Sequence, residues 1–126
     1  MATRLLSLSV LLLGLTFSLA EDKKEPITTE EAAKKLKEKV TLKMEVKSSY
    51  TKDGLCWLNS ESNRNDAKNF TVFLDRPTLK KFKDAKIEDP SEHFKGKKVE
   101  VTGMVIEYKE KPQIKLASPE DIKIMD

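Results

Sequence analysis

Few residues of this chain have the types and spacing that catalysis requires. Cys56 is the only cysteine and His93 the only histidine, so neither a zinc ligand set nor a Cys–His pair is expected. The acidic residues Asp84, Glu88 and Asp89 flank a predicted helix end, where they fit a solvated surface. No glycine-rich phosphate loop is present. We therefore expect no enzyme, no catalytic residue, no metal site and no cofactor.

The lone cysteine bears on both stability and reactivity. A domain with one thiol has no internal disulfide, so its hydrophobic core must stabilise it alone. Cys56 stands between Leu55 and Trp57 in an apolar segment, which is typical of a buried small hydrophobic residue. A reactive or dimer-forming thiol is the alternative.

Two aromatic residues can form a stacking surface. The segments 55–59 and 69–74 alternate as strands do, so that Cys56 points inward while Trp57 and Phe73 point outward. Two neighbouring exposed rings can stack nucleobases, at about 1–3 kcal/mol for each base. Two alternatives stay open. A register shift of one residue would bury Trp57 in the core, or the N-terminal helix would cover both rings.

Basic residues that could contact phosphates near these rings are Lys43, Lys47, Lys52 and Arg64. The chain is rich in lysine, yet its formal net charge is only +3 because acidic and basic residues are interleaved. This pattern is typical of a solvated surface and argues against strong non-specific DNA binding. It also weakens the electrostatic attraction that usually dominates affinity for phosphate backbones.

The elements that position these residues follow from periodicity and turn signals. Thr28 and Glu31 have the spacing of a capping box, which predicts a helix over 29–39. A mid-strand glycine, Gly103, indicates a bulge or a sharp bend. Apolar alternation and helical spacing predict strands over 40–47, 55–59, 69–74, 97–108 and 113–116, a short helix over 78–86, and a segment over 122–125 that extends or rejoins the sheet.

The first twenty residues are typical of a secretory signal. Arg4 supplies the positive charge, the stretch from Leu5 to Leu15 is mostly apolar, and Ser18-Leu19-Ala20 gives a small-x-small cleavage pattern. The apolar stretch is shorter than the roughly 20 residues that a spanning helix needs, so cleavage is favoured over an uncleaved anchor. We expect a signal over 1–20, a charged tether over 21–27, export to the periplasm or the extracellular space, and no stable membrane insertion after cleavage.

The order of elements narrows the fold. A five-stranded OB barrel has the same order of elements: a helix, three strands, a short helix and two strands. Closing so small a barrel also requires a sharp bend in a strand, which Gly103 can provide. Periodicity alone leaves other small barrels and α+β sandwiches open.

One run of residues carries a family resemblance. Phe94-Lys95-Gly96-Lys97-Lys98-Val99-Glu100-Val101-Thr102-Gly103-Met104-Val105 resembles the aromatic-x-Gly-Lys-x-Val-x-Val-x-Gly-x-Val stretch of OB-fold domains of the tRNA-anticodon-binding-like group, including its short exported bacterial members. The segments 112–116 and 121–124 are similar to that group's closing pattern, and 57–59 and 69–72 to its second and third strands. The chain departs from the group at Met44, where such domains often carry a glycine.

The resemblance implies an all-β fold, namely a five-stranded OB-fold β-barrel over 28–126 with an N-terminal helix and a short helix between strands three and four. It also implies a non-catalytic exported binding module for single-stranded nucleic acid. OB barrels usually bind on the outward side of their second and third strands. The expected ligand-binding residues are Trp57, Phe73, Lys43, Lys47, Lys52 and Arg64. The alternative is a protein- or peptide-interaction domain of the cell envelope without nucleic-acid binding. In either case we expect a monomer.

Overall fold

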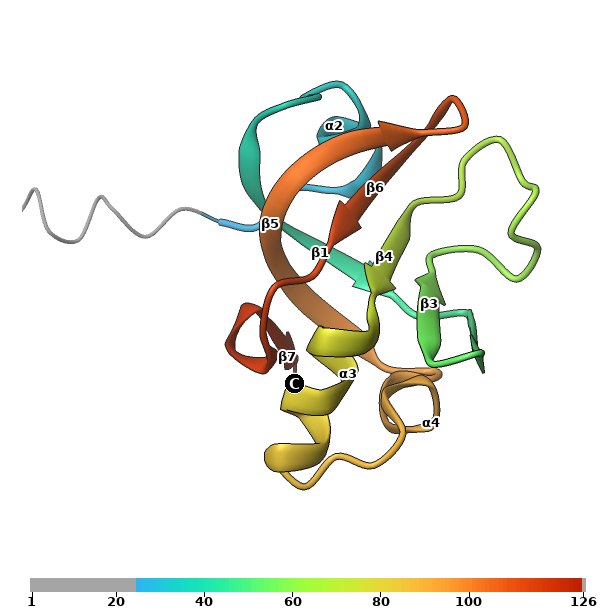
Figure 1. Cartoon of the computed structure of the whole chain (residues 1–126). Coiled ribbons are helices and arrows are strands. Elements are labelled where there is room, and N and C mark those ends of the chain that lie inside the picture. Colours follow the sequence, from blue (N-terminus) through green and yellow to red (C-terminus); the bar gives the residue numbers. More distant parts are fainter. Residues whose placement is uncertain (1–24, 126) are drawn as a thin grey trace, which may run out of the picture.

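The computed structural model of the chain describes residues 25–125, so the predicted signal over 1–20 and most of the tether lie outside the described residues. Within them, no helix is long and apolar enough to cross a membrane. Figure 1 shows the elements, which in chain order are α2 (Thr29–Ala33), β1 (Lys39–Glu45), β2 (Ser48–Lys52), β3 (Leu55–Asn59), β4 (Thr71–Leu74), α3 (Arg76–Asp84), α4 (Pro90–Phe94), β5 (Lys98–Tyr108), β6 (Lys111–Lys115), the 3-10 helix η1 (Pro119–Asp121) and β7 (Ile122–Ile124).

The strands form one seven-stranded sheet in the order β1-β5-β6-β4-β3-β2, with β7 paired to β5. The β4–β6 pair is parallel and the other strand pairs are antiparallel. This is a mostly β fold with short helices, as predicted. The sheet is not closed by hydrogen bonds and has seven strands, so the prediction of a five-stranded barrel is not confirmed.

The two extra strands have a simple origin. The segment predicted as one strand over 40–47 changes partner at its end, because Val46 N donates to Lys97 O at 2.9 Å while Lys47 N donates to Asn59 O at 3.0 Å. Beyond this point the chain continues as β2, which pairs with β3 up to the turn between Lys52 and Leu55. The C-terminal residues rejoin the sheet as β7. Consecutive strands β1 and β2 therefore occupy the two ends of the sheet order.

Strand β5 carries the bend that its mid-strand glycine predicts. It pairs with β1 through Lys98–Met104 and with β6 through Val105–Tyr108, and it is strongly curved (Figure 1). A Cβ atom at Gly103 would lie 2.6 Å from Cγ2 of Ile114. The absence of a side chain at this position lets β6 cross close to β5 as β5 passes from one partner to the other.

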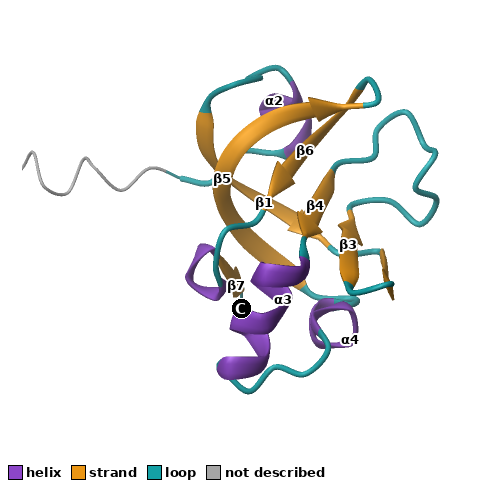
Figure 2. Cartoon of the chain, in the orientation of Figure 1, coloured by secondary structure: helices purple, strands orange, loops and turns teal. Residues whose placement is uncertain are grey.

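The inward faces of the strands supply most of the core. Cys56 and Leu58 are fully buried on β3, as are Val72 and Leu74 on β4, which is the inward set that alternation predicts. Helices α3 and α4 close one end of the sheet (Figure 2). There the Phe82 and Phe94 rings meet edge to face at 6.0 Å between centroids.

The N-terminal helix is shorter than predicted. The capping box between Thr28 and Glu31 is present, but α2 ends at Ala33 instead of continuing to residue 39. Residues 34–39 are exposed, and the one apolar side chain among them, Leu36, is 40% exposed. Without an apolar face to bury, the segment gains too little from packing to stay helical, and the backbone turns at Lys37 with φ 68°.

Candidate functional site

Three rings lie in register across β2, β3 and β4. Tyr50 is paired with Trp57, and Trp57 with Phe73. The ring centroids of Tyr50 and Trp57 are 4.9 Å apart, and those of Trp57 and Phe73 are 5.7 Å apart. Tyr50 is 38% exposed, whereas the other two rings are half-buried. These three residues are called the aromatic row below. Its members point away from the core, so each presents part of its ring to solvent.

The row decides between the alternatives that the sequence left open. Cys56 and Leu58 are fully buried on either side of Trp57, so the one-residue register shift that would place Trp57 in the core is wrong. The N-terminal helix does not cover the rings either, because α2 packs against β1 and none of its residues lines the depression beside Tyr50 and Trp57. The alternation therefore places Trp57 and Phe73 side by side, as predicted; their part in ligand binding stays a prediction.

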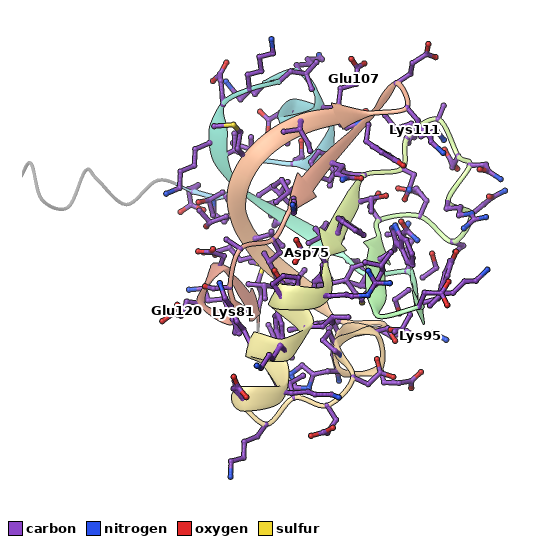
Figure 3. The ribbon with its side chains drawn as sticks, viewed as in Figure 1. Asp75, Lys81, Lys95, Glu107, Lys111 and Glu120 are labelled. Atoms are coloured by element: carbon purple, nitrogen blue, oxygen red, sulfur yellow. The ribbon has the colours of Figure 1, made fainter. Side chains whose placement is uncertain are left out.

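A depression of about 430 Å³ adjoins the aromatic row. It lies between the loop over residues 60–70 and the turn that joins β5 to β6, which approach each other in Figure 1. Lys111, labelled in Figure 3, extends from that turn and donates from Nζ to Arg64 O at 3.4 Å. The depression is lined by Tyr50, Trp57, Asn59, Arg64, Asn65, Asn69, Thr71, Tyr108, Lys109, Lys111, Pro112 and Gln113.

Arg64 connects the loop to the aromatic row. Its Nη1 donates to the Tyr50 hydroxyl at 2.8 Å, and its guanidinium carbon lies 5.6 Å from the centroid of the same ring. The cation and the ring thus attract each other both by a hydrogen bond and by cation–π interaction. The predicted contribution of Arg64 to a site beside the rings is consistent with this placement.

A buried asparagine fixes the loop in place. Asn69 is 4% exposed, and its Oδ1 accepts from Glu61 N at 3.1 Å. Its Nδ2 donates to Arg64 O, Thr71 Oγ1 and Asn59 Oδ1, at 3.3, 3.2 and 3.3 Å. Because every polar atom of this side chain is used, the loop is held in one position over β3 and β4.

The structure separates the three predicted lysines. Lys43 lies on β1 opposite Glu100 of β5 and does not line the depression, because the chain changes sheet partner between Lys43 and the row. Lys47 forms an ion pair with Glu61 at 3.8 Å. Lys52 is exposed at the end of β2, two residues from Tyr50, but it does not line the depression. Of the predicted cations, Arg64 alone lines the depression beside the aromatic row.

Sequence reasoning missed several residues that line the depression, namely Tyr50, Asn59, Lys109, Lys111 and Gln113. For Tyr50 a signal existed, because pairing Lys52 with Leu55 across the turn at Asp53 places Tyr50 opposite Trp57. The lysines lie in the connection between the predicted strands over 97–108 and 113–116. Their position beside Arg64 depends on the β4–β6 pairing, which no local pattern specifies.

Among the described residues, Cys56 is buried and no metal site is found. Burial raises the pKa of the Cys56 thiol to about 11, although a hydrogen bond with Thr51 opposes this shift. The buried, protonated thiol fits the expectation of a small hydrophobic residue and contradicts the reactive alternative. Between residues 25 and 125, no group of three His, Cys, Asp or Glu side chains could hold a metal ion.

Comparisons with known proteins identify the fold. No protein-family model and no curated protein sequence matches this chain. Among solved structures, it is similar to OBody AM1L10 bound to hen egg-white lysozyme, with a TM-score of 0.56, 16% identity, and coverage of 82% of this chain and 96% of that one. For asparaginyl-tRNA synthetase from Pyrococcus horikoshii the TM-score is 0.54 and the identity 14%, covering 81% of this chain and 23% of that one.

An aspartyl-tRNA synthetase from Entamoeba histolytica is also similar, with a TM-score of 0.50, 12% identity, and coverage of 79% of this chain and 21% of that one. The chain therefore spans less than a quarter of either synthetase. At such low identity these likenesses show the fold alone, which is of OB type.

Proposed function

We propose that this chain is a non-catalytic binding module of OB type that takes single-stranded nucleic acid along the aromatic row. The observation that carries the proposal is the alignment of three outward rings on neighbouring strands, with centroid spacings of 4.9 and 5.7 Å. Bases offer flat faces to such rings whatever their sequence, and each stacked base contributes about 1–3 kcal/mol. The tRNA synthetases among the similar structures agree with this proposal but do not carry it.

Cations at the rim supply the contacts to the phosphate backbone. Arg64, Lys109 and Lys111 line the depression next to the row, and Lys109 Nζ lies 5.5 Å from the centroid of the Tyr108 ring. The net charge of the chain is only +3. Binding should therefore depend on a few local cations and respond moderately to salt.

The proposal includes a closed barrel. We interpret β1 and β2 as two halves of one bent first strand, since they are consecutive and pair with β5 and β3 at the two ends of the sheet order. Counted in this way, the five barrel strands are β1 with β2, then β3, β4, β5 and β6, and β7 is an addition. On this interpretation Trp57 and Phe73 lie on the second and third barrel strands, where OB folds commonly bind nucleic acid, and Tyr50 extends the row onto the first.

The module is also proposed to be exported and monomeric. The pattern of Arg4, the apolar stretch and Ser18-Leu19-Ala20 supports cleavage after Ala20 and action in the periplasm or the extracellular space. A reporter fused behind residues 1–27 should be exported and lose the first twenty residues. An uncleaved or cytoplasmic fusion would contradict this part of the proposal.

A protein or peptide partner on the same face is the second candidate. Tyr50 and Tyr108 are 38% and 56% exposed at the depression, and tyrosine is enriched at protein interfaces. The OBody that resembles this chain is bound to a protein, lysozyme. If the partner is a protein or peptide, the chain should not bind oligonucleotides. Measuring oligonucleotide binding therefore distinguishes the two candidate functions.

The proposal is tested by fluorescence anisotropy of labelled single-stranded DNA and RNA oligonucleotides at several salt concentrations. Arg64→Gln and Lys109→Gln should each weaken binding and reduce the slope of log affinity against log salt by about 0.7. Lys43→Gln is the matched control, because Lys43 is an exposed lysine away from the depression, and it should change neither quantity. Absence of binding at low salt, or an equal effect of Lys43→Gln, would refute the proposal.

A further inference from the structure

Asn59 has a polar group that receives no partner from the described residues. The residue is 4% exposed and lines the depression. Its Oδ1 accepts from Thr71 Oγ1 at 2.9 Å and from Asn69 Nδ2 at 3.3 Å. These two bonds use the oxygen and so orient the amide. The nitrogen of the same amide is then left as the group that a ligand can meet.

The Nδ2 of Asn59 is the unused donor of a residue that lines the depression. Among residues 25–125 it donates to no protein atom, yet no fully buried side-chain nitrogen or oxygen in this part of the chain lacks a partner. The nitrogen must therefore be accessible, and the depression is the space that Asn59 lines. A nearly buried amide with an unused donor selects for a ligand that brings an acceptor.

The surroundings of Asn59 suit a flat polar ligand. Trp57 lies two residues earlier, on the same face of β3. Gln113 is paired with Thr71 from the neighbouring strand and lines the same depression. A ring stacked on Trp57 would thus have its edge directed toward two amides. The cations Arg64 and Lys111 stand at the rim.

We infer that the depression binds one nucleobase that carries an exocyclic carbonyl, with Asn59 Nδ2 donating to that oxygen. The inference rests on the proposed function and adds a base preference to it. Thymine, uracil, cytosine and guanine carry such a carbonyl, whereas adenine does not. Adenine offers N1 or N7 as an acceptor, but the amino group beside either nitrogen would then face an amide whose oxygen is already engaged and cannot accept from it. A base that leaves a polar group unpaired against this amide is disfavoured.

The wild-type protein provides the first test. Short oligomers of deoxythymidine should bind at least about fivefold more tightly than deoxyadenosine oligomers of equal length, the worth of one hydrogen bond. Chain flexibility also favours pyrimidine runs, so a third oligomer is needed. It contains a difluorotoluene base, which keeps the shape of thymine but replaces the carbonyl oxygens by fluorine, and it should bind about as weakly as the deoxyadenosine oligomer.

Matched variants provide the second test. Asn59→Asp keeps an oxygen that can accept from Thr71 and Asn69 but replaces the Nδ2 donor by a second acceptor. The affinities for the thymine and adenine oligomers should then become about equal. Asn65→Asp adds the same charge to an exposed residue of the same depression. This variant should weaken the binding of both oligomers equally and leave the ratio of their affinities unchanged. Thermal melting checks that each variant is folded.

The outcomes separate the inference from the function on which it rests. Equal binding of all three oligomers by the wild type, or an unchanged ratio in folded Asn59→Asp, would overturn the base preference and leave the proposed function intact. Absence of binding by every oligomer would overturn both. If Asn59→Asp does not fold, the comparison of thymine with its difluorotoluene analogue in the wild type decides the question.

Discussion

At the scale of single residues, adjacent positions on β3 have opposite environments. Cys56 is fully buried, while Trp57 is half-buried against Tyr50 and Phe73. The pleat of the strand alone produces this difference, since successive side chains point to opposite faces of a sheet. The apolar face beneath therefore holds the register of the rings above it: a slip of one residue would expose the core side chains of β3.

The buried thiol gives a prediction at this scale. Because burial raises the pKa of Cys56 from 9.0 to about 11, the folded protein at pH 8 should hold about a hundredfold less thiolate than the unfolded chain. We expect a thiol reagent to label native Cys56 slowly and urea-unfolded Cys56 rapidly. The folded state binds this proton more tightly, so the thiol lowers stability as pH rises from 9.0 to about 11.

Labelling is followed by absorbance at pH 8 with and without urea. A free thiol compound added at equal concentration controls for the effect of urea on the reagent itself. Labelling of the native protein at the rate of the unfolded chain would show that Cys56 is accessible and would contradict the placement of β3.

Local alternation was sufficient to predict the faces of Trp57 and Phe73, because both belong to strands with a period of two. It was not sufficient for the cations. Lys43 and Lys47 are close in sequence to the row, but the change of sheet partner at Val46 and Lys47 leaves Lys43 on β1. Lys111 is distant in sequence and reaches Arg64 O. Contacts of that kind depend on tertiary structure that no short pattern contains.

At the scale of elements, the crossing of β5 and β6 depends on the missing side chain of Gly103. A Cβ there would lie 2.6 Å from Ile114 Cγ2, and Ile114 is fully buried and cannot easily move. Gly103→Ala should therefore destabilise the protein by about 1–3 kcal/mol. Urea unfolding measures the change. The adjacent Met104→Ala, at a side chain that is 53% exposed, is the control and should cost less than about 0.5 kcal/mol.

The start of α3 gives a prediction that depends on pH. Asp75 accepts from Thr78 N at 3.1 Å and lies 3.2 Å from Lys115 Nζ. Partial burial opposes its ionisation, but the hydrogen bonds from Thr78 and the nearby Lys115 outweigh that effect and lower its pKa below 3.8. Its charge therefore stabilises the fold above pH 3.8, and this contribution is lost as pH falls through the lowered pKa.

Asp75→Asn keeps a capping side chain and removes the charge. It should be less stable than the wild type by about 0.2–1 kcal/mol at neutral pH, the usual worth of an exposed pair, and the difference should vanish in acid. Asp75→Ala also removes the cap and should cost about 1 kcal/mol more. Urea unfolding over a range of pH measures both. A difference between Asp75→Asn and the wild type that does not vary with pH would contradict the role given to the charge.

The elements show where sequence patterns suffice and where packing decides. The capping box at Thr28 correctly marked the start of α2, but residues 34–39 offered no apolar face, and the helix ends at Ala33. Strand β2 was missed because its residues alternate without an apolar face and are mostly exposed. It is a strand because β3 supplies its hydrogen bonds. In the first segment the packing that would sustain a helix is missing, and in the second the pairing with β3 outweighs the lack of an apolar pattern.

At the scale of the whole molecule, the proposed binding face and the helical end are distinct regions. Helices α3 and α4 close one end of the sheet, while the loop over 60–70 and the β5–β6 turn meet at another side (Figure 2). The depression and the aromatic row lie together on the latter side. Because the net charge is small, local rings and cations, and not the overall field of the protein, should determine binding.

The fluorescence of Trp57 tests the central claim most directly, since it is the one tryptophan of the chain and the middle ring of the row. We would titrate the protein with short single-stranded DNA and RNA at low and moderate salt. The account predicts saturable quenching and an affinity that falls as salt rises. Phe73→Ala should lower the affinity roughly fivefold or more, and Lys43→Gln should leave it unchanged. Emission that does not respond to any oligonucleotide at low salt would contradict it.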